Sequence, residues 1–519
     1  MSEVETMPGA DSAPNSAEQM VEQVDVLIVG AGVSGIGAAH HLQTRSPDQS
    51  YMILEAREEM GGTWDLFKYP GIRSDSDMYT FGYAFRPWQD GKVFADGPSI
   101  KNYVEETAKD ADITRHVRFK HRVLSADWNS ETARWRVEAK RTDTGQRVFV
   151  ECRFLMMCSG YYRYDHGHIV KFEGEADFRG DILHPQHWPE GYDYSGKKVV
   201  IIGSGATAVT LVPAMAEDAA HVTMLQRSPT YIAPRPAVDP VANFLRKVLP
   251  SKAAYATTRV KNVLVSIFFF ELAKRFPHVV KNMVLKYIRE ELGEDYDVDK
   301  HFTPKYNPWD ERFCAAPDGD FFQALKSGKA SVETDHIERF TETGIQLKSG
   351  EHLDADIIIP ATGLEMLIAG GMRFHVDGEA IEPTQSISYR GMMLSPLPNM
   401  AMAFGYTNAS WTLKIDLTCE RVCRLLNYMD AKGYDYCVPE PPEDLETQPL
   451  LNLQSGYIKR AEPYLPKQGT KPPWRTYQNY IQDMLAIRYG KLEDGALKFG
   501  RAGDREAKPS PDIMADAAE

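Results

Sequence analysis

One turn near the N-terminus constrains the fold more than any other feature of the sequence. An apolar, β-branched run at 24–29 is typical of a buried parallel strand, and it leads directly into a Gly-x-Gly-x-x-Gly turn. Gly30 permits the tight change of direction, Gly32 lets backbone amides approach a pyrophosphate, and Gly35 lets the next helix pack on the strand. The pattern predicts a dinucleotide-binding unit, the alternative being a turn with a purely structural role.

A second predicted strand supports the first interpretation. The run at 51–54 follows a helix-favouring stretch at 38–42 and ends in Glu55. In dinucleotide-binding units a carboxylate at this place binds the 2′-hydroxyl of an adenosine ribose. The unit is therefore expected to bind a nucleotide with an unmodified ribose, and its position at the start of the chain favours FAD.

The same arrangement recurs in the middle of the chain. A strand-like run at 197–202 leads into a similar turn, in which Gly203 and Gly205 are kept and Ala208 replaces the third glycine. The next predicted strand, 221–225, does not end in an acid. This second unit is expected to bind another dinucleotide.

The two residues that follow Gln226 indicate which dinucleotide the second unit takes. Arg227 could bind a 2′-phosphate through its guanidinium group, and Ser228 could donate a further hydrogen bond. An acid at the same place would repel that phosphate. The sequence therefore predicts NADP(H) rather than NAD(H), with a surface ion pair of Arg227 as the alternative.

Two different nucleotide sites together describe a flavoprotein that NADPH reduces. The first site would hold FAD, and the second would hold the hydride donor. A further apolar run at 356–359 leads to a small-residue turn that ends at Gly363. Such a turn lets the chain pass close to a cofactor.

Charge and cysteine content argue against several other classes of protein. The 59 Lys and Arg against 73 Asp and Glu leave a formal net charge of −14, whereas a nucleic-acid partner needs a basic surface. The six cysteines include no Cys-x-x-Cys pair, so a zinc ribbon, a disulfide scaffold and a redox dithiol are not expected. No metal site is predicted, and a reduced, cytoplasmic compartment fits best.

The chain ends and the most apolar internal stretch bear on membrane contact. Residues 1–23 are polar and acidic, which predicts a disordered leader rather than a signal peptide, and residues 502–519 predict a similar tail. The apolar run at 263–270 falls short of the ~20 residues that span a bilayer. We expect a helix packed in protein there, and the alternative is a surface that touches lipid or an apolar substrate.

The 519 residues are expected to fold as an α/β protein with two Rossmann-like dinucleotide-binding domains. Apolar residues at helical spacing predict a helical insertion in the NADP domain, in which Phe268, Phe269 and Phe270 are expected to pack in the core, with an apolar entrance as the alternative. The expected boundaries are 24–162 and 364–501 for the FAD domain, 163–237 and 302–363 for the NADP domain, and 238–301 for the helical subdomain.

A longer motif follows the first predicted domain. It has the form Phe-x-Gly-x-x-x-His-x-x-x-Trp-Pro, with Phe178, Gly180, His184 and Trp188 at its fixed places. This string resembles the fingerprint of the Baeyer–Villiger monooxygenases, whereas related flavin N- and S-oxygenases usually end theirs with Tyr or Phe. The resemblance implies a segment that couples domain movement, so His184 is expected to act in conformational change rather than in chemistry.

Two shorter motifs extend the resemblance over nearly the whole chain. Gly62, Thr63 and Trp64, with Asp75 downstream, are similar to a family motif that folds against the flavin and presents an Asp near its reactive edge. Arg312 falls at the place of the family's active-site arginine. Further segments resemble the subgroup that contains the ethionamide-activating monooxygenase and long-chain alkane-degradation flavoproteins.

The resemblance also implies a mechanism. NADPH would reduce FAD, O₂ would add at the flavin C4a carbon, and the peroxide would attack a small apolar ketone to give an ester or lactone, with sulfides as further substrates. Arg312 would stabilise the negative species because a guanidinium stays protonated, and Asp75 would orient it. A structural salt bridge of Arg312 and a helix cap at Asp75 are the alternatives. Glu311 stands where the family often has a Lys that helps hold the 2′-phosphate, which shifts that role onto Arg227.

Two other functions stay open at this stage. One is a related monooxygenase that oxidises heteroatoms or alkyl chains. The other is a flavoprotein reductase that transfers electrons without oxygenation, although the chain has no redox dithiol or iron–sulfur ligand set.

Overall fold

The first glycine turn follows an inner strand of a nine-stranded sheet. The computed structural model describes residues 21–311, 313–451 and 453–504, so most of the predicted leader and tail lie outside the described residues. The strand order is β18-β17-β4-β5-β6-β1-β2-β3, with β21 paired to β6. The strands are β1 (Glu22–Val29), β2 (Tyr51–Leu54), β3 (Val117–Arg118), β4 (His121–Asn129), β5 (Arg134–Arg141), β6 (Arg147–Met157), β17 (Arg373–Val376), β18 (Glu379–Ile381) and β21 (Met400–Met402).

Strand β1 begins at Glu22, two residues before the predicted start of the FAD domain at residue 24. It runs parallel to both β2 and β6, and Val26, Leu27 and Ile28 are fully buried, as the continuous apolar run predicts. Helix α1 (Val33–Arg45) connects β1 to β2 and packs on α11 (Trp411–Lys432). The short helices α2 (Thr63–Leu66) and α3 (Met78–Phe81) and the longer α4 (Gly97–Asp110) complete this half of the molecule.

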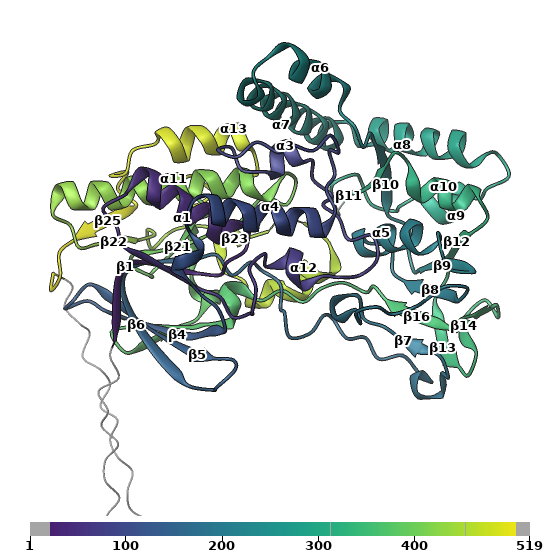
Figure 1. Ribbon diagram of the computed structural model, residues 1–519, viewed down its shortest axis with the longest axis horizontal. Coiled ribbons are helices and arrows are strands. Elements are labelled where there is room, and N and C mark those ends of the chain that lie inside the picture. Colours follow the sequence, from purple (N-terminus) through teal and green to yellow (C-terminus); the bar gives the residue numbers. More distant parts are fainter. Residues whose placement is uncertain (1–20, 312, 452, 505–519) are drawn as a thin grey trace, which may run out of the picture.

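The second glycine turn belongs to a separate, five-stranded parallel sheet in the other half of the molecule (Figure 1). Helix α5 (Ala206–Met215) follows the turn and connects two neighbouring parallel strands. After the last strand of this sheet in sequence order, β16, the chain returns to the first sheet at β17. The strand order is β12-β9-β8-β16-β7, with β7 (Asp181–Ile182), β8 (Lys198–Ile202), β9 (His221–Gln226), β12 (Ala330–Thr334) and β16 (Ile357–Pro360).

The stretch predicted to be helical forms α6 (Pro240–Val248), α7 (Ser251–Arg275), α8 (Pro277–Leu292) and α9 (Val298–Phe302), which confirms that prediction. Helices α6 and α7 lie at the top of Figure 1, above the two sheets. The buried guanidinium of Arg259 in α7 donates to the carbonyl oxygens of Tyr79 and Gly82 and pairs with Asp416 in α11. In α8, by contrast, Val284 and other residues pack in the core of the second half.

The apolar run at 263–270 lies within α7 and is only partly packed. Val263 is buried, but Phe268 and Phe269 are 61% and 42% exposed. Phe270 packs against Trp309, with ring centroids 5.6 Å apart. The expectation of core packing is therefore wrong for Phe268 and Phe269. None of the helices within the described ranges combines the length and the hydropathy that a membrane crossing requires.

The other elements form small sheets and short helices. They are β10 (Tyr231–Arg235) with β11 (Phe313–Pro317); β13 (Ile337–Thr341), β14 (Gly344–Leu347) and β15 (His352–Asp354); β19 (Ile387–Tyr389), β20 (Met393–Leu394), β23 (Thr447–Pro449) and β24 (Lys467–Gly469); β22 (Tyr436–Pro439) with β25 (Leu497–Gly500); and α10 (Asp320–Lys326), α12 (Gly456–Ala461) and α13 (Tyr480–Asp483). The predicted α/β class with two Rossmann-like units and a helical insertion is confirmed.

Candidate active site and nucleotide-binding turns

A cavity of about 1270 Å³ is lined by both halves and by the helical segment. Gly30 and Glu55 line it from the first sheet, and Thr207 lines it from α5. Phe269 adds an apolar wall from α7. One continuous space therefore reaches from the first glycine turn to the start of the helix that follows the second.

The glycines of the first turn differ in how much room their surroundings leave for a side chain. Gly30 has φ +107°, and a Cβ there would lie 2.6 Å from the carbonyl oxygen of Cys158. A Cβ on Gly35 would lie 1.9 Å from the carbonyl oxygen of Gly30. At Gly32, in contrast, the nearest atom would be 3.6 Å away, and this glycine lines the cavity. The backbone at Gly32 therefore leaves room for a ligand to approach.

The side chain of Glu55 lies beside this turn. One of its carboxylate oxygens accepts a hydrogen bond from the N–H of Ala31 at 2.7 Å, and the other accepts one from the N–H of Arg57 at 2.9 Å. Burial raises the pKa of Glu55, and these backbone hydrogen bonds oppose the shift. Each oxygen can accept a further bond, so the side chain can bind a hydroxyl group in the cavity that it lines.

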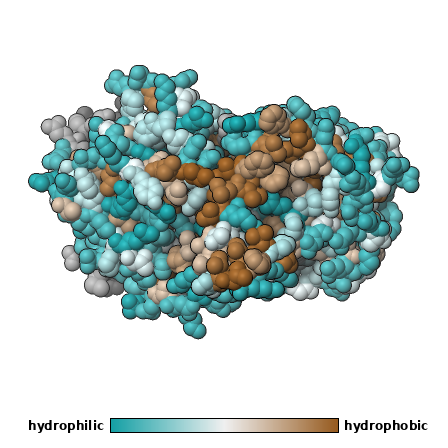
Figure 2. Space-filling model, turned by 90° about the horizontal axis from the view of Figure 1, so that it is seen from above, coloured by the Kyte–Doolittle hydropathy of each residue, from teal (hydrophilic) through white to brown (hydrophobic). Residues whose placement is uncertain are grey.

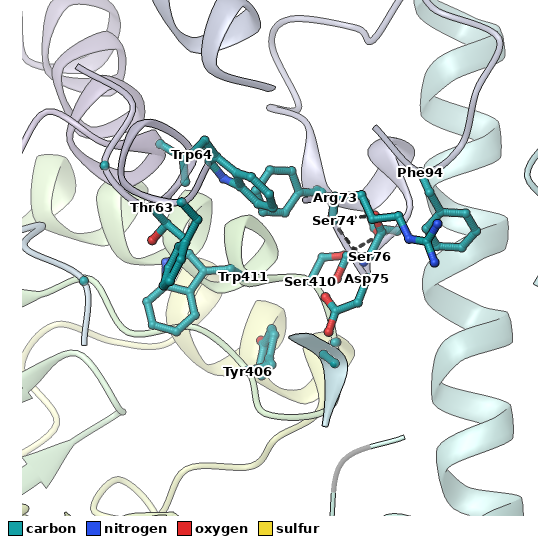
Figure 3. Close-up of a pocket in the computed structure, with 18 of the residues that line it drawn as sticks. Thr63, Trp64, Arg73, Ser74, Asp75, Ser76, Phe94, Tyr406, Ser410 and Trp411 are labelled. Carbon is teal, nitrogen blue, oxygen red and sulfur yellow. Dashed lines mark hydrogen bonds between the residues drawn. The ribbon is translucent and has the colours of Figure 1, made fainter. Parts of the chain in front are cut away.

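The motif that contains Thr63 and Trp64 folds directly onto the first turn. Gly61 donates from its N–H to the carbonyl oxygen of Ala31 at 3.1 Å. Gly62 has φ +59°, and a Cβ there would lie 3.2 Å from the Cα of Gly32. Thr63 and Trp64 both line the cavity, as Figure 3 shows. The resemblance-based expectation that this motif lies against the first nucleotide site is therefore consistent with the geometry.

The loop after this motif reaches the second half of the molecule. Tyr69 is buried and shares a hydrogen bond with the hydroxyl of Thr207 at the start of α5, while burial raises its pKa to about 12. Gly71 packs so closely that a Cβ would lie 2.6 Å from the Cβ of Ala214 in α5. The loop therefore holds the two nucleotide-binding units together beside the cavity.

Asp75 lies on this loop and lines the cavity. Its side chain extends toward the open space that Tyr406 and Trp411 also border (Figure 3). The residue that caps α3 is Asp77, whose carboxylate accepts from the N–H of Thr80 at 3.1 Å. The helix-cap alternative therefore applies to Asp77 and not to Asp75.

Arg73, two residues before Asp75, was not predicted as a site residue. It lines the cavity and pairs with Asp320 through one nitrogen, Nη1. Its other terminal nitrogen, Nη2, is buried without a hydrogen-bond partner among the described residues. A buried donor of this kind indicates a missing acceptor, such as a ligand oxygen.

The second turn repeats the first in most respects. Gly203 has φ +131°, and a Cβ there would lie 2.4 Å from the carbonyl oxygen of Ala361. A Cβ on Gly205 would meet nothing within 4 Å, so this position is open to a ligand, while Ala208 is fully buried in the core. The Ser204 hydroxyl donates to the carbonyl oxygen of Ser228 at 3.2 Å, which ties the turn to the end of β9.

Arg227 is exposed beyond β9, and no ion pair joins it to an acid among the described residues. Its positive charge lowers the pKa of Glu311, as does the stronger effect of Lys459, although burial raises that pKa overall. Lys459 lies in α12, a segment that the sequence did not associate with this site. The adjacent Arg460 lies 3.4 Å from the place of a Cβ on Gly363, whose φ is +107°.

The fingerprint residues lie away from the cavity. Phe178 packs near Phe340, and a Cβ on Gly180 would lie 2.2 Å from the carbonyl oxygen of Asp356. Trp188 packs on the core of the second half. His184 accepts from the N–H of Gln186 through Nδ1 at 3.2 Å, and burial lowers its pKa.

Arg312, the predicted catalytic residue, lies outside the described residues. Its neighbours Trp309 and Phe313 line the cavity. The sequence also missed most of the cavity wall that α7 and α8 form, which consists of Lys261, Asn262, Val265, Ser266 and Phe269 in α7 and Val280, Met283, Val284 and Tyr287 in α8. Their apolar spacing predicted helices but carried no sign of which face would border a cavity.

Relatives of known sequence support the interpretation of the first turn. The flavin-binding monooxygenase-like family matches residues 23–367. The FAD-containing monooxygenase EthA of Mycobacterium tuberculosis is 54% identical over 484 residues, which cover 93% of this chain and 99% of that protein. The probable FAD-binding monooxygenase AlmA of Acinetobacter baylyi is 51% identical, with 95% and 100% covered.

Solved structures share the fold at much lower identity. Oxidised steroid monooxygenase bound to NADP aligns with a TM-score of 0.72 at 23% identity, over 92% of this chain and all of that one. Cyclohexanone monooxygenase bound to ε-caprolactone aligns with a TM-score of 0.70 at 19% identity, with the same coverage. Because the family match and the relatives at more than half identity both extend over most of the chain, this protein belongs to the flavin-binding monooxygenase-like family.

Proposed function

We propose that this chain is an FAD monooxygenase of the Baeyer–Villiger type, which uses NADPH and O₂ to insert one oxygen atom beside a ketone carbonyl and also oxidises sulfides. The observation that carries the proposal is the single cavity that Gly32, Trp64, Asp75 and Thr207 line together. A flavin on the first unit and a hydride donor on the second would share that space, as hydride transfer requires.

The residues present fit FAD at the first unit. The backbone at Gly32 is open to a pyrophosphate, and the carboxylate of Glu55 can accept from a ribose hydroxyl. Trp64 and Trp411 both give the cavity flat apolar surfaces. FAD is also the group in the names of the relatives EthA and AlmA. When bound, it supplies the capacity to take a hydride from NADPH and to activate O₂.

The second unit fits NADP(H). Gly205 leaves the turn open to phosphate groups, and the buried Nη2 of Arg73 is a donor in the cavity that Thr207, at the start of α5, also lines. Arg227 and Lys459 supply positive charge at the end of β9, where a 2′-phosphate would lie. The structurally similar steroid monooxygenase was solved with NADP bound.

The chain's own part in the reaction is to place charge and to exclude water. Arg312 is assigned the stabilisation of negative charge on the reacting oxygens, because its guanidinium stays protonated and donates in a fixed fork. Asp75, which lines the cavity, is assigned the orientation of that cation. Closure of the two halves would keep water out, and the fingerprint segment with His184 is assigned to that movement.

The wall formed by α7 and α8 indicates the kind of substrate. Val265, Phe269, Val280 and Met283 present apolar side chains to the cavity. They would bind a ketone or sulfide with an aliphatic or aromatic body, since such a surface gains free energy by burying apolar groups.

The reaction can be tested by incubating the holoenzyme with NADPH, ¹⁸O₂ and a series of methyl ketones. An ester that carries one labelled oxygen atom is expected, and an added sulfide should yield a labelled sulfoxide. Labelled products from sulfides or alkyl carbons alone would instead support the heteroatom- or alkyl-oxidising alternative. Hydrogen peroxide without any oxygenated product would support the reductase.

A further inference from the structure

Helix α6 turns its apolar face outward. Val241, Phe244 and Val248 recur at spacings of three and four residues, which places them on one face of the helix. Their exposed fractions are 47%, 62% and 57%, whereas Ala242 is the buried residue of this helix. A helix on the surface of a globular protein normally packs such a stripe against the core.

Helices α7 and α8 extend this apolar surface. Val260, Leu264 and Phe268 repeat every four residues along α7 and are each at least half exposed, as are Val279 and Met283 on α8. Figure 2, which views the molecule from above α6 and α7, shows apolar side chains gathered across the middle of this face. We call these residues the apolar collar: Val241, Phe244, Val248, Val260, Leu264, Phe268, Val279 and Met283.

The apolar collar borders the mouth of the cavity. Val241 and Met283 belong to the collar and also line the cavity. Val265 and Phe269, on the neighbouring face of α7, line the cavity while remaining 41% and 42% exposed. An apolar surface thus continues from the outside of the molecule into the proposed active site. Contiguous exposed apolar surface of this kind marks an interaction site rather than ordinary surface variation.

The charge around the collar is positive although the whole chain carries −14. From 240 to 275 the sequence contains seven Lys and Arg against one acid, Glu271. Four of these cations, Arg259, Lys261, Lys274 and Arg275, pair with acids, which leaves Arg246, Lys247 and Lys252 outside the ion pairs of the described residues. Lys247 and Lys252 are exposed and have no ion-pair partner among the described residues. They flank the exposed Val248 at the turn between α6 and α7. Apolar side chains between free lysines are typical of helices that lie in the surface of an anionic membrane.

A second copy of the chain fits this surface less well than a lipid bilayer does. A symmetric dimer through the collar would bring the unpaired lysines of both copies to one shared surface, and this added like charge opposes association. An anionic headgroup layer instead attracts the lysines while its acyl region accepts Phe244 and Phe268.

We propose that the apolar collar docks on the surface of an anionic lipid bilayer, with α6 lying in the interface and the cavity mouth facing the acyl chains. Docking itself is independent of the oxygen-transfer reaction. It adds to the proposed function the inference that the apolar substrate enters from the membrane rather than from water.

Vesicle flotation with the full-length holoenzyme tests the docking. The protein is expected to float with vesicles of phosphatidylcholine and phosphatidylglycerol, and less with phosphatidylcholine alone or at high salt. Phe244→Ser combined with Phe268→Ser should lower the vesicle partition coefficient about tenfold or more, because two exposed apolar groups are lost. Ile169→Ser, at a side chain that is 67% exposed outside the collar, is the matched control and should bind like the parent protein.

A second variant examines the charge. Lys247→Glu with Lys252→Glu should abolish the preference for phosphatidylglycerol while leaving the flavin content and melting temperature unchanged. The proposal is overturned if the parent protein floats with neither kind of vesicle, or if the Phe244/Phe268 variant binds as well as the Ile169 control. It is also overturned if light scattering shows a dimer that the Phe244/Phe268 variant dissociates without any vesicle binding. Failure of oxygen transfer with intact flotation would contradict the proposed function alone.

Discussion

Glu55 and Ala31 are joined by a hydrogen bond of 2.7 Å, which fixes the end of β2 against the first glycine turn. The carboxylate thereby lies at the edge of the cavity with unused acceptor capacity, next to the open backbone at Gly32. This geometry connects a local sequence pattern to a specific ligand group, and it can be tested by removing the acid.

Glu55→Ala should weaken FAD binding about tenfold or more, because a charged hydrogen-bond acceptor for the ribose is lost. The flavin content of the purified protein and the affinity of the apoprotein for added FAD measure the effect. Glu58→Ala removes a nearby carboxylate that is 77% exposed and pairs with Lys120, so it serves as the control. Equal flavin affinity in the two variants would remove Glu55 from the binding site.

Arg227→Ala and Lys459→Ala should each raise the KM for NADPH about tenfold and leave that for NADH nearly unchanged, because only NADPH carries the 2′-phosphate. Glu311→Lys should have the opposite effect on NADPH, since it removes the negative charge between these cations. Steady-state oxidation of the two nucleotides gives both constants. Lys286→Ala, at a side chain that is 76% exposed on α8, is the control. A parallel loss with NADH would contradict the assignment.

Arg312→Ala should lower ester formation by a factor of about 10²–10³ while NADPH still reduces the flavin, because only the oxygenation step needs the added positive charge. Asp75→Asn should have a smaller effect of the same kind. Rapid-mixing measurements of flavin bleaching and product analysis separate the two steps. An unchanged ester yield in the Arg312 variant would exclude this residue from the mechanism.

Arg259→Ala should destabilise the protein, because the variant leaves Asp416 buried without this partner and frees the carbonyl oxygens of Tyr79 and Gly82. Loss of one partner of a buried ion pair costs about 3 kcal/mol, which for a chain of this length corresponds to a fall of about 3 °C in melting temperature. Arg275→Ala, in an exposed pair with Glu271 on the same helix, should change it little. Similar melting temperatures for both variants would show that Arg259 does not hold α7 in place.

His40 gives the protein a predicted sensitivity to acid. Its ring stacks on Phe85 with centroids 3.6 Å apart, and burial followed by the neighbouring His41 lowers its pKa from 6.5 to about 4. The unfolded chain therefore binds more protons at this site, so stability is lost as the pH falls from about 6.5 toward 4. The melting temperature should fall less over this interval in His40→Gln. The same fall in both proteins would show that other groups cause it.

The sequence predicted the elements that are determined by short-range patterns of residues. Gly30 and Gly203 follow apolar strands at a spacing that few other structures require, and both adopt the positive φ that such turns need. The helical insertion was also predicted correctly from its apolar spacing. These features depend on neighbours only a few residues away.

Features that depend on distant segments could not be predicted. Lys459 reaches the surroundings of Glu311 through the packing of α12, and nothing in the local sequence indicates that contact. The outward orientation of the apolar face of α6 could not be predicted either, because periodicity shows that a helix has an apolar face but not what covers it. Phe268 was expected in the core for this reason, and it is 61% exposed.

The stoichiometry of the reaction tests the central claim most directly. The holoenzyme is supplied with limiting NADPH, excess O₂ and a methyl ketone, and the amounts of NADPH oxidised, ester formed and hydrogen peroxide released are compared. Equal amounts of ester and oxidised NADPH, with little peroxide, are predicted, because both cofactors and the substrate would react within one cavity. Peroxide equal to the NADPH consumed, with no ester from any ketone, would contradict the account.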